Sequence, residues 1–206
     1  MKRQVGYLIN YPEGLTGERG IFYNYITGSN GVFIEAESPL VSARIPIADC
    51  EFRGLAPVEK KIGLLYGSIP QRFFDLTLDM FLTHPDTEQY VAVTASDGYH
   101  FYIPNQDRKE ISVVYDVGRS VILEFHSHGH MEARFSGTDN KDETGLKFYG
   151  VIGKLKDIPI VKLRIGVYGY FHNLAWKDIF DGSLCGALEN EIKEVIDEGE
   201  LYSIFP

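Results

Sequence analysis

The sequence predicts an α+β protein, on the basis of three observations. Short apolar segments bounded by turn residues recur along most of the chain, which is typical of strands. Residues 70–82 instead show the broad apolar face of a buried helix, and helical spacing returns near the C-terminus. No internal repeat or low-complexity tract is present. A mixture of strands and a few helices of this kind belongs to the α+β class.

Residues 1–65 are expected to form a small β-rich region of unknown role. The pair Asn30-Gly31 separates two strand-like segments, residues 20–25 and 32–34, and is a good hairpin signal. A further run, residues 40–47, alternates apolar residues with polar or small ones. No catalytic cluster occurs in this part of the sequence, so we look for function in the second part.

Residues 66–206 are expected to form the second domain, which opens with the helix. Pro70 suits a first helical turn, and His84-Pro85 ends the segment. Asp97-Gly98 marks a tight hairpin between two strands. The expected strands cover residues 90–94, 99–103, 111–115, 120–125, 148–155 and 160–170. Residues 184–196 have the spacing of a C-terminal amphipathic helix.

The strand at residues 160–170 has a regular alternation. Its apolar residues are separated by Lys162, Arg164 and Gly166, so one face of the strand is expected to face solvent.

Composition excludes several classes of function. A net charge of -9 over 206 residues argues against a nucleic-acid-binding protein, which would carry a basic face. No stretch approaches the roughly 18 apolar residues of a membrane span, and the first apolar run is too short for a secretory signal. Cys50 and Cys185 form no CxxC pair, which indicates buried or partly buried thiols in a reducing cytoplasm rather than zinc ligands. We expect a cytoplasmic protein with neither a nucleic acid nor a membrane as partner.

The chemistry-bearing stretch begins at Glu124-Phe125-His126-Ser127-His128 and continues, seven residues later, with Ser136-Gly137-Thr138-Asp139. Two histidines separated by one residue lie on the same side of a strand. A carboxylate that returns one short loop later can complete a three-ligand site with a fourth position open. Neutral imidazoles, an anionic oxygen and an exchangeable water are what a catalytic zinc requires. On spacing alone, His128 and His130 form an equally good pair.

These residues resemble the JAMM motif of the MPN (Mov34/JAB) metalloprotease family, in which His-Ser-His is followed after seven residues by Ser-x-x-Asp. The resemblance covers about residues 69–176 and implies a JAB-like, cytidine-deaminase-like mixed sheet with flanking helices. It implies that His126, His128 and Asp139 bind Zn2+ and that Ser136 helps hold the oxyanion. Counting back from Ser136 leaves His130 a loop or substrate-facing role. The leading β region followed by this domain also resembles a narrower bacterial family, the PRTRC system A proteins.

The family pattern also contains a glutamate after the first helix, often as Glu-x-x-Gly. Glu88 stands there, although Val91 occupies the glycine position, so the resemblance implies that Glu88 is the general base. Glu124 shares a strand face with His126 and is the local alternative, as a hydrogen-bonding partner or as the base.

The loop after the histidines departs from the family in two places. Gly129 and Phe135 replace prolines, which is expected to loosen the loop because proline fixes φ and glycine frees it. Ser136 can also cap a following helix, since Ser-x-x-Asp is a helix-start signature. Asp142 and Glu143 are expected to be solvated acids in the first turn of that helix.

The resulting hypothesis is a zinc-dependent peptidase or isopeptidase, similar to deubiquitinases. Its expected partner is a protein substrate, such as a ubiquitin-like or otherwise tail-modified protein, with operon-encoded partners or self-association as further expectations. A catalytically weak JAB-like scaffold in a bacterial multi-protein system is the alternative. A mononuclear iron oxygenase also uses two histidines and one carboxylate, but needs neither Ser136 nor an upstream glutamate.

Overall fold

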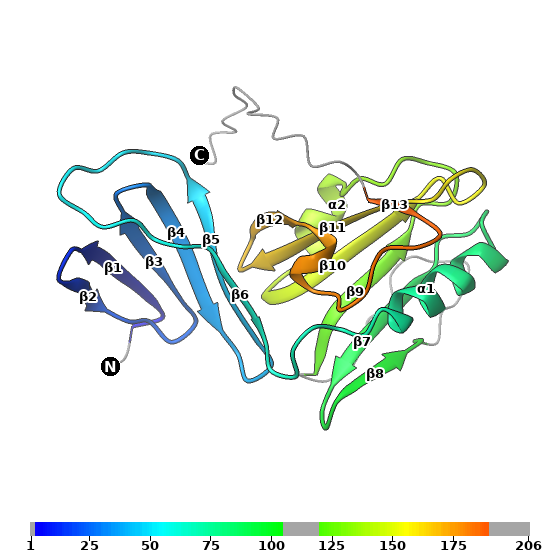
Figure 1. Ribbon diagram of the computed structural model, residues 1–206, viewed down its shortest axis with the longest axis horizontal. Helices are drawn as coiled ribbons and strands as arrows, with labels where there is room; N and C mark the ends of the chain where they lie inside the picture. Colours follow the sequence, from blue (N-terminus) through cyan, green and yellow to red (C-terminus); the bar gives the residue numbers. More distant parts are fainter. Residues whose placement is uncertain (1–2, 105–119, 190–206) are drawn as a thin grey trace.

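The computed structural model describes residues 3–104 and 120–189, which form two β-sheets and two α-helices (Figure 1). The first sheet has the strand order β2-β1-β3-β4-β5-β6. Within it, β1 pairs with β3 in parallel, and the other neighbours are antiparallel. Its strands are β1 (Val5–Tyr11), β2 (Gly14–Glu18), β3 (Tyr23–Gly28), β4 (Gly31–Glu37), β5 (Val41–Ala48) and β6 (Lys61–Leu64).

The second sheet has the order β12-β11-β10-β9-β7-β8, and β13 pairs with β11. It is mixed, because β9 and β10 are parallel while β10 and β11 are antiparallel. Its strands are β7 (Tyr90–Ala95), β8 (Tyr99–Tyr102), β9 (Val121–Ser127), β10 (Leu146–Gly153), β11 (Ile160–Val167), β12 (Tyr170–Leu174) and β13 (Leu188–Glu189). The helices are α1 (Arg72–Thr83) and α2 (Gly137–Asp142), with a 3-10 turn at Trp176–Asp178. The predicted α+β class, a mixed sheet with flanking helices after a β-rich region, is confirmed.

Helix α1 covers one face of the second sheet. The ring of its buried Phe74 lies 6.0 Å from the ring of Phe125 on β9 and 4.6 Å from that of Trp176, measured between centroids. Because side chains alternate along a strand, Phe125 points into this core while His126 points to the opposite face. Strand β9 therefore separates the hydrophobic core from the face that carries the histidines.

The first sheet packs against the second through β4 and β5. Ile34, Val41 and Ile45 from these strands belong to the same buried cluster as Ile165 of β11 and Phe74 of α1. Farther along the interface, the hydroxyl groups of Tyr25 and Tyr170 lie 2.9 Å apart. The two predicted regions thus share one hydrophobic core, and the boundary at residue 65 stays a prediction.

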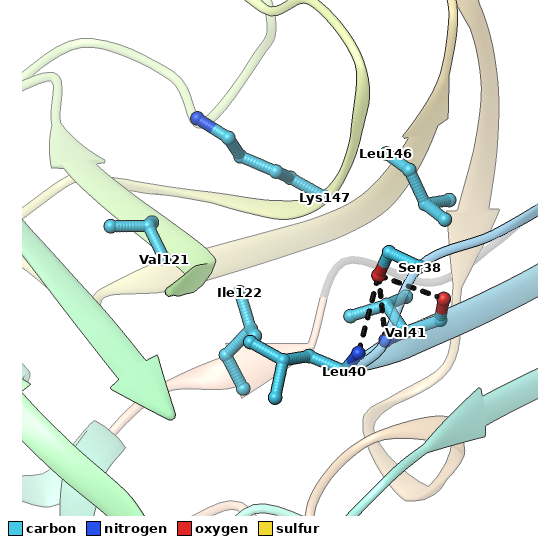
Figure 2. A pocket seen from close by; sticks show the side chains of 7 residues that line it. All are labelled: Ser38, Leu40, Val41, Val121, Ile122, Leu146 and Lys147. Carbon is cyan, nitrogen blue, oxygen red and sulfur yellow. Dashed lines mark hydrogen bonds between the residues drawn. The ribbon is translucent and has the colours of Figure 1, made fainter. Parts of the chain in front are cut away.

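A small cavity of about 130 Å³ marks the contact between the two sheets (Figure 2). Its lining residues are Ser38, Leu40 and Val41 of the first sheet, and Val121, Ile122, Leu146 and Lys147 of the second. The Ser38 hydroxyl accepts hydrogen bonds from the N–H groups of Leu40 and Val41 and lies within hydrogen-bonding distance of the Val41 carbonyl. The Ser38 hydroxyl is therefore engaged in closing the β4–β5 turn rather than directed at a ligand.

Several predictions about the sequence outside the site need correction. Leu184 is not helical and Leu188–Glu189 is strand β13, so the C-terminal helix does not begin where its spacing predicted. The remainder of that helix, and the strand predicted at residues 111–115, lie outside the described residues. Cys50 and Cys185 are exposed rather than buried. No helix in the described part of the chain is long and apolar enough to cross a bilayer.

Candidate metal centre

The two histidines of the motif lie at the end of a central strand. His126 is paired with Tyr90 of β7 on one side and with Val151 of β10 on the other. His128 follows the last residue of β9, but its N–H still donates to the carbonyl of Ile152 at 2.8 Å. This bond extends the strand geometry, so both imidazoles lie on the same face, with ring centroids 5.0 Å apart.

The chain reverses direction at Gly129 directly after the second histidine. Gly129 has φ +56°, which is left-handed backbone that proline, with φ near -65°, cannot adopt. A Cβ atom at this position would also lie 2.9 Å from the carbonyl oxygen of Pro85. The turn is held by hydrogen bonds from Met131 N–H to the His128 carbonyl and from Leu155 N–H to the Gly129 carbonyl. Gly129 was expected to loosen this loop, but the described backbone needs glycine there.

Ser136 and Asp139 form a capping box at the start of α2. The Asp139 N–H donates to Ser136 Oγ at 3.2 Å, and the Ser136 N–H donates to Asp139 Oδ2 at 2.5 Å. The helix-start role that Ser-x-x-Asp predicts is therefore present. It also orients the carboxylate, because binding of Oδ2 leaves Oδ1 directed at His126 Nε2, 3.7 Å away.

One ligand atom from each of His126, His128 and Asp139 lies within 4.8 Å of the others. Tetrahedral zinc ligands at about 2.0–2.1 Å from the ion are about 3.4 Å apart, so small side-chain movements would close this group on an ion. His126 Nε2 is buried and has no hydrogen-bond partner among the described residues. Because leaving a buried ring nitrogen without a partner is costly, a bound ion or water at this atom would be stabilising. A divalent cation fits this donor set.

The electrostatics of the group also suit a cation. Burial lowers the pKa of His126 to about 4, helped by His128 and Arg164 and opposed by Asp139. Burial raises the pKa of Asp139, but hydrogen bonds from Ser136 and the nearby histidines outweigh it, so the net shift is downward. At neutral pH the group therefore presents a neutral imidazole and an anionic carboxylate, the forms that bind metals.

Residues 77–165 match the family model described as prokaryotic homologs of the JAB domain. This segment runs from the middle of α1 to β11 and contains the two histidines, Ser136 and Asp139. Residues 77–165 are therefore similar to JAB domains. Neither the curated proteins nor the solved structures contain a significant match to the chain. JAB domains include metalloproteases, and the family often binds zinc. The narrower PRTRC resemblance is not confirmed.

Glu88, the predicted base of the JAB domain, lies in the loop between α1 and β7. It precedes the first residue of β7 by two positions, and its side chain is exposed. The neighbouring Gln89 and Ser127 are joined by hydrogen bonds, from Gln89 N–H to Ser127 Oγ and from Ser127 N–H to the Gln89 carbonyl, each 2.9 Å. Continuing this antiparallel register places Glu88 opposite His128, at the end of the strand pair that carries His126. Its role as base stays a prediction.

The alternative glutamate of the JAB domain is already engaged. Glu124 Oε1 accepts a hydrogen bond from Lys147 Nζ at 2.8 Å, and both side chains are partly buried. Glu124 lies two residues before His126 on the same face, about 7 Å along the strand. Its carboxylate therefore pairs with a lysine beside the site. His130, the alternative ligand, is exposed and is not part of the clustered group.

The sequence did not reveal the side chains that hold the acidic loop. Arg164 was predicted to face solvent, but it is 5% exposed and forms an ion pair with Glu143. Glu143 was predicted to be a solvated acid in the first turn of α2, but it is 8% exposed and caps the end of that helix. Alternation along a strand cannot distinguish solvent from a loop that folds over the same face. The presence of an arginine between apolar residues of the strand was a weak signal of such a loop.

Proposed function

We propose that the JAB domain is a zinc-dependent metallopeptidase that hydrolyses peptide or isopeptide bonds. The observation that carries this proposal is the buried Nε2 atom of His126, which has no hydrogen-bond partner within residues 3–104 and 120–189. It faces Asp139 Oδ1, with the ring of His128 beside it. Because this nitrogen is neutral at pH 7, it is available as a ligand. The family match supports the same chemistry, since JAB domains include metalloproteases.

His126, His128 and Asp139 would hold the ion. When bound there, zinc supplies a Lewis acid that polarises a carbonyl group and makes water a nucleophile near neutral pH. Three protein ligands are the number found at catalytic zinc sites, whereas structural zinc sites have four. Mononuclear iron is the alternative occupant of a site with two histidines and one carboxylate.

Glu88 would act as the general base and acid. Its register opposite His128 brings it to the same end of the sheet as the ligands, and its exposed side chain can reach toward them. It would take a proton from water as the carbonyl carbon is attacked, and return that proton to the departing amine. Both proton transfers use the Glu88 carboxylate. Replacing this carboxylate with an amide should therefore stop turnover without removing a metal ligand.

Ser136 would stabilise the developing negative charge on the carbonyl oxygen. In the capping box its Oγ accepts a hydrogen bond from the Asp139 N–H, so the hydroxyl proton remains available for donation. A single donor aimed at an oxyanion contributes about 3 kcal/mol to lowering the barrier. The hydrogen bond from the Asp139 N–H fixes the position of Ser136 Oγ, so this bond supports both the helix cap and the proposed catalytic role.

The substrate class that this site suits is a protein with a flexible tail, such as a ubiquitin-like protein attached to a lysine. A second candidate function is a scaffold that binds partner proteins. The first sheet favours it, because Tyr7 of β1 and Phe22, directly before β3, are exposed, as is every residue of the edge strand β2. Exposed apolar side chains beside an unpaired strand edge are typical of protein-binding surfaces.

The test begins with protein purified without added metal. One equivalent of zinc by elemental analysis is expected, whereas one equivalent of iron would contradict the proposal. Cleavage is then measured with a ubiquitin-type tail joined to a lysine ε-amine and with a tail joined to a fluorogenic amine. The Glu88→Gln variant should keep its zinc and lose at least 100-fold in turnover. Zinc binding without cleavage of either tail would support the scaffold instead.

A further inference from the structure

The helix that carries Asp139 has little packing of its own. Helix α2 is six residues long, and none of its side chains is buried. Isolated helices of this length are unstable in water, so its position must come from contacts at its ends. The capping box fixes Ser136 relative to Asp139, but it does not fix either residue relative to the histidine strand.

Arg164 supplies contacts at both ends of α2. Its guanidinium carbon lies 3.7 Å from the ring centroid of Phe135, the residue before Ser136. Its Nη1 donates to Asn140 Oδ1 at 2.7 Å, one residue after Asp139. Its Nε and Nη2 donate to Glu143 Oε2 at 2.8 and 2.5 Å, at the end of the helix. A planar guanidinium can make all these contacts at once, which an ammonium group cannot.

The arginine is itself held firmly by the sheet. It lies on β11 opposite Tyr149 of β10, and Tyr149 in turn lies opposite Glu124 of β9. The ring of Phe171 covers its second side, with the centroid 3.9 Å from the guanidinium carbon. Arg164 therefore stands on the same sheet face as His126, sandwiched between two aromatic rings. A rigid link thus joins the strands that carry the histidines to the loop that carries the carboxylate.

Phe135 extends this link to the ligands. Its ring contacts the ring of His126 edge to face, with centroids 6.2 Å apart, while its own face is covered by Arg164. Arg164 forms an ion pair with Glu143, which offsets part of its positive charge beside the histidines.

We propose that Arg164 is a positioning residue, which by binding Phe135, Asn140 and Glu143 holds Asp139 within reach of an ion bound to His126 and His128. This inference rests on the zinc site of the proposed function. It assigns the rigidity of the acidic loop to the buried Arg164–Glu143 ion pair and to the rings of Phe135 and Phe171 that cover the guanidinium. It also predicts that the metal site weakens when that pair is removed, although neither member is a ligand.

The test compares two double variants. Arg164→Met/Glu143→Leu removes the buried pair together, because removal of one partner alone would leave an unpaired buried charge. The matched control is Arg44→Met/Glu35→Leu, which removes a two-bond arginine–glutamate pair between β4 and β5. Zinc affinity is measured by competition with a chromophoric chelator, and the ligand set by the visible absorption of the Co2+-loaded protein. The melting temperature of each metal-free variant is recorded as a measure of stability.

We expect the Arg164/Glu143 variant to bind zinc at least tenfold more weakly, as for other residues that orient metal ligands. Its Co2+ spectrum should approach that of Asp139→Ala, whereas the Arg44/Glu35 variant should keep wild-type affinity and spectrum. Wild-type affinity and spectrum in a destabilised Arg164/Glu143 variant would overturn the inference and leave the zinc site intact. A wild-type protein that binds no zinc would overturn the proposed function itself.

If the double variant does not fold, Asn140→Ala removes one Arg164 contact from an exposed residue. A several-fold loss of zinc affinity is then expected, and wild-type affinity would contradict the inference. Arg164→Lys keeps the positive charge but replaces the planar guanidinium with a single ammonium group. Its Co2+ spectrum is expected to lie between those of the wild type and Asp139→Ala.

Discussion

The Nε2 atom of His126 lies 3.7 Å from the Oδ1 atom of Asp139, and no hydrogen bond joins the two side chains. An imidazolium and a carboxylate this close would normally form an ion pair. Burial keeps the pKa of His126 low, however, so the imidazole is neutral and the carboxylate ionised at pH 7. The arrangement has the spacing and charge of two ligands that are ready for an ion.

The stability of the metal-free protein should depend on pH through His126. Its folded-state pKa of about 4 lies below the unfolded value of 6.5, so the unfolded chain binds more protons between these values. The free energy of unfolding should therefore fall by about 2 kcal/mol from pH 7 to pH 5, measured by urea denaturation. The His126→Asn variant should lose most of this dependence. An equal pH slope in that variant would contradict the assignment.

Removal of metal should lower the melting temperature. A ligand that binds only the folded state at 100 times its dissociation constant contributes about 2.7 kcal/mol. For a chain of this size, chelation should therefore lower the melting temperature by roughly 5–10 °C in differential scanning calorimetry. His126→Ala and Asp139→Ala should melt at the same temperature with and without chelator. The control is His172→Asn, a histidine outside the clustered group, which should respond to chelator like the wild type.

Substitution of Ser136 should separate its two roles. Ser136→Ala removes the cap and the hydroxyl donor, so we expect a loss of about 1 kcal/mol in stability and roughly 100-fold in turnover. Ser136→Thr keeps both groups and should keep most of both properties. Stability is measured by denaturant titration and turnover with the lysine-linked tail. Wild-type turnover in a destabilised Ser136→Ala protein would contradict the oxyanion role and show that Ser136 only caps the helix.

The turn at Gly129 should be sensitive to any side chain. Gly129→Ala adds the cost of left-handed backbone and a contact of 2.9 Å with the Pro85 carbonyl, so a loss of about 1–3 kcal/mol and weaker zinc binding are expected. Gly169→Ala is the matched control, because Gly169 also has positive φ but no atom within 4 Å of an added Cβ. It should cost about 1 kcal/mol and leave zinc affinity unchanged. The comparison uses denaturant titration and chelator competition on both variants.

Some parts of the site could be predicted from sequence because they depend on local periodicity. The spacing of His126 and His128 places both on one strand face, and Ser136-x-x-Asp139 is a local capping pattern. The short loop between those two pairs allowed a shared three-ligand site to be suggested, and the family resemblance assigned the ligands. The fold brings the three proposed ligands together, while their role as ligands stays a prediction.

Other parts depend on contacts between segments that are distant in sequence. Arg164 is 21 residues from Glu143, and no alternation rule indicates that a loop covers its strand face. The same holds for Gly129, whose carbonyl accepts a hydrogen bond from the N–H of Leu155, in the segment that follows β10. The C-terminal segment shows the opposite error, since the helical spacing that starts at Leu184 does not prevent Leu188–Glu189 from pairing with β11. Tertiary pairing overrode local preference there.

The shared interior of the two sheets has a consequence for any attempt to study the JAB domain alone. Ile34, Val41 and Ile45 are fully or almost fully enclosed, and the surface they cover belongs to strands that lead into the metal centre. A fragment that starts at residue 66 would expose that apolar surface to water and would aggregate or lose its fold. The two halves should instead melt in a single transition, with the leading sheet forming part of the common interior rather than a detachable module.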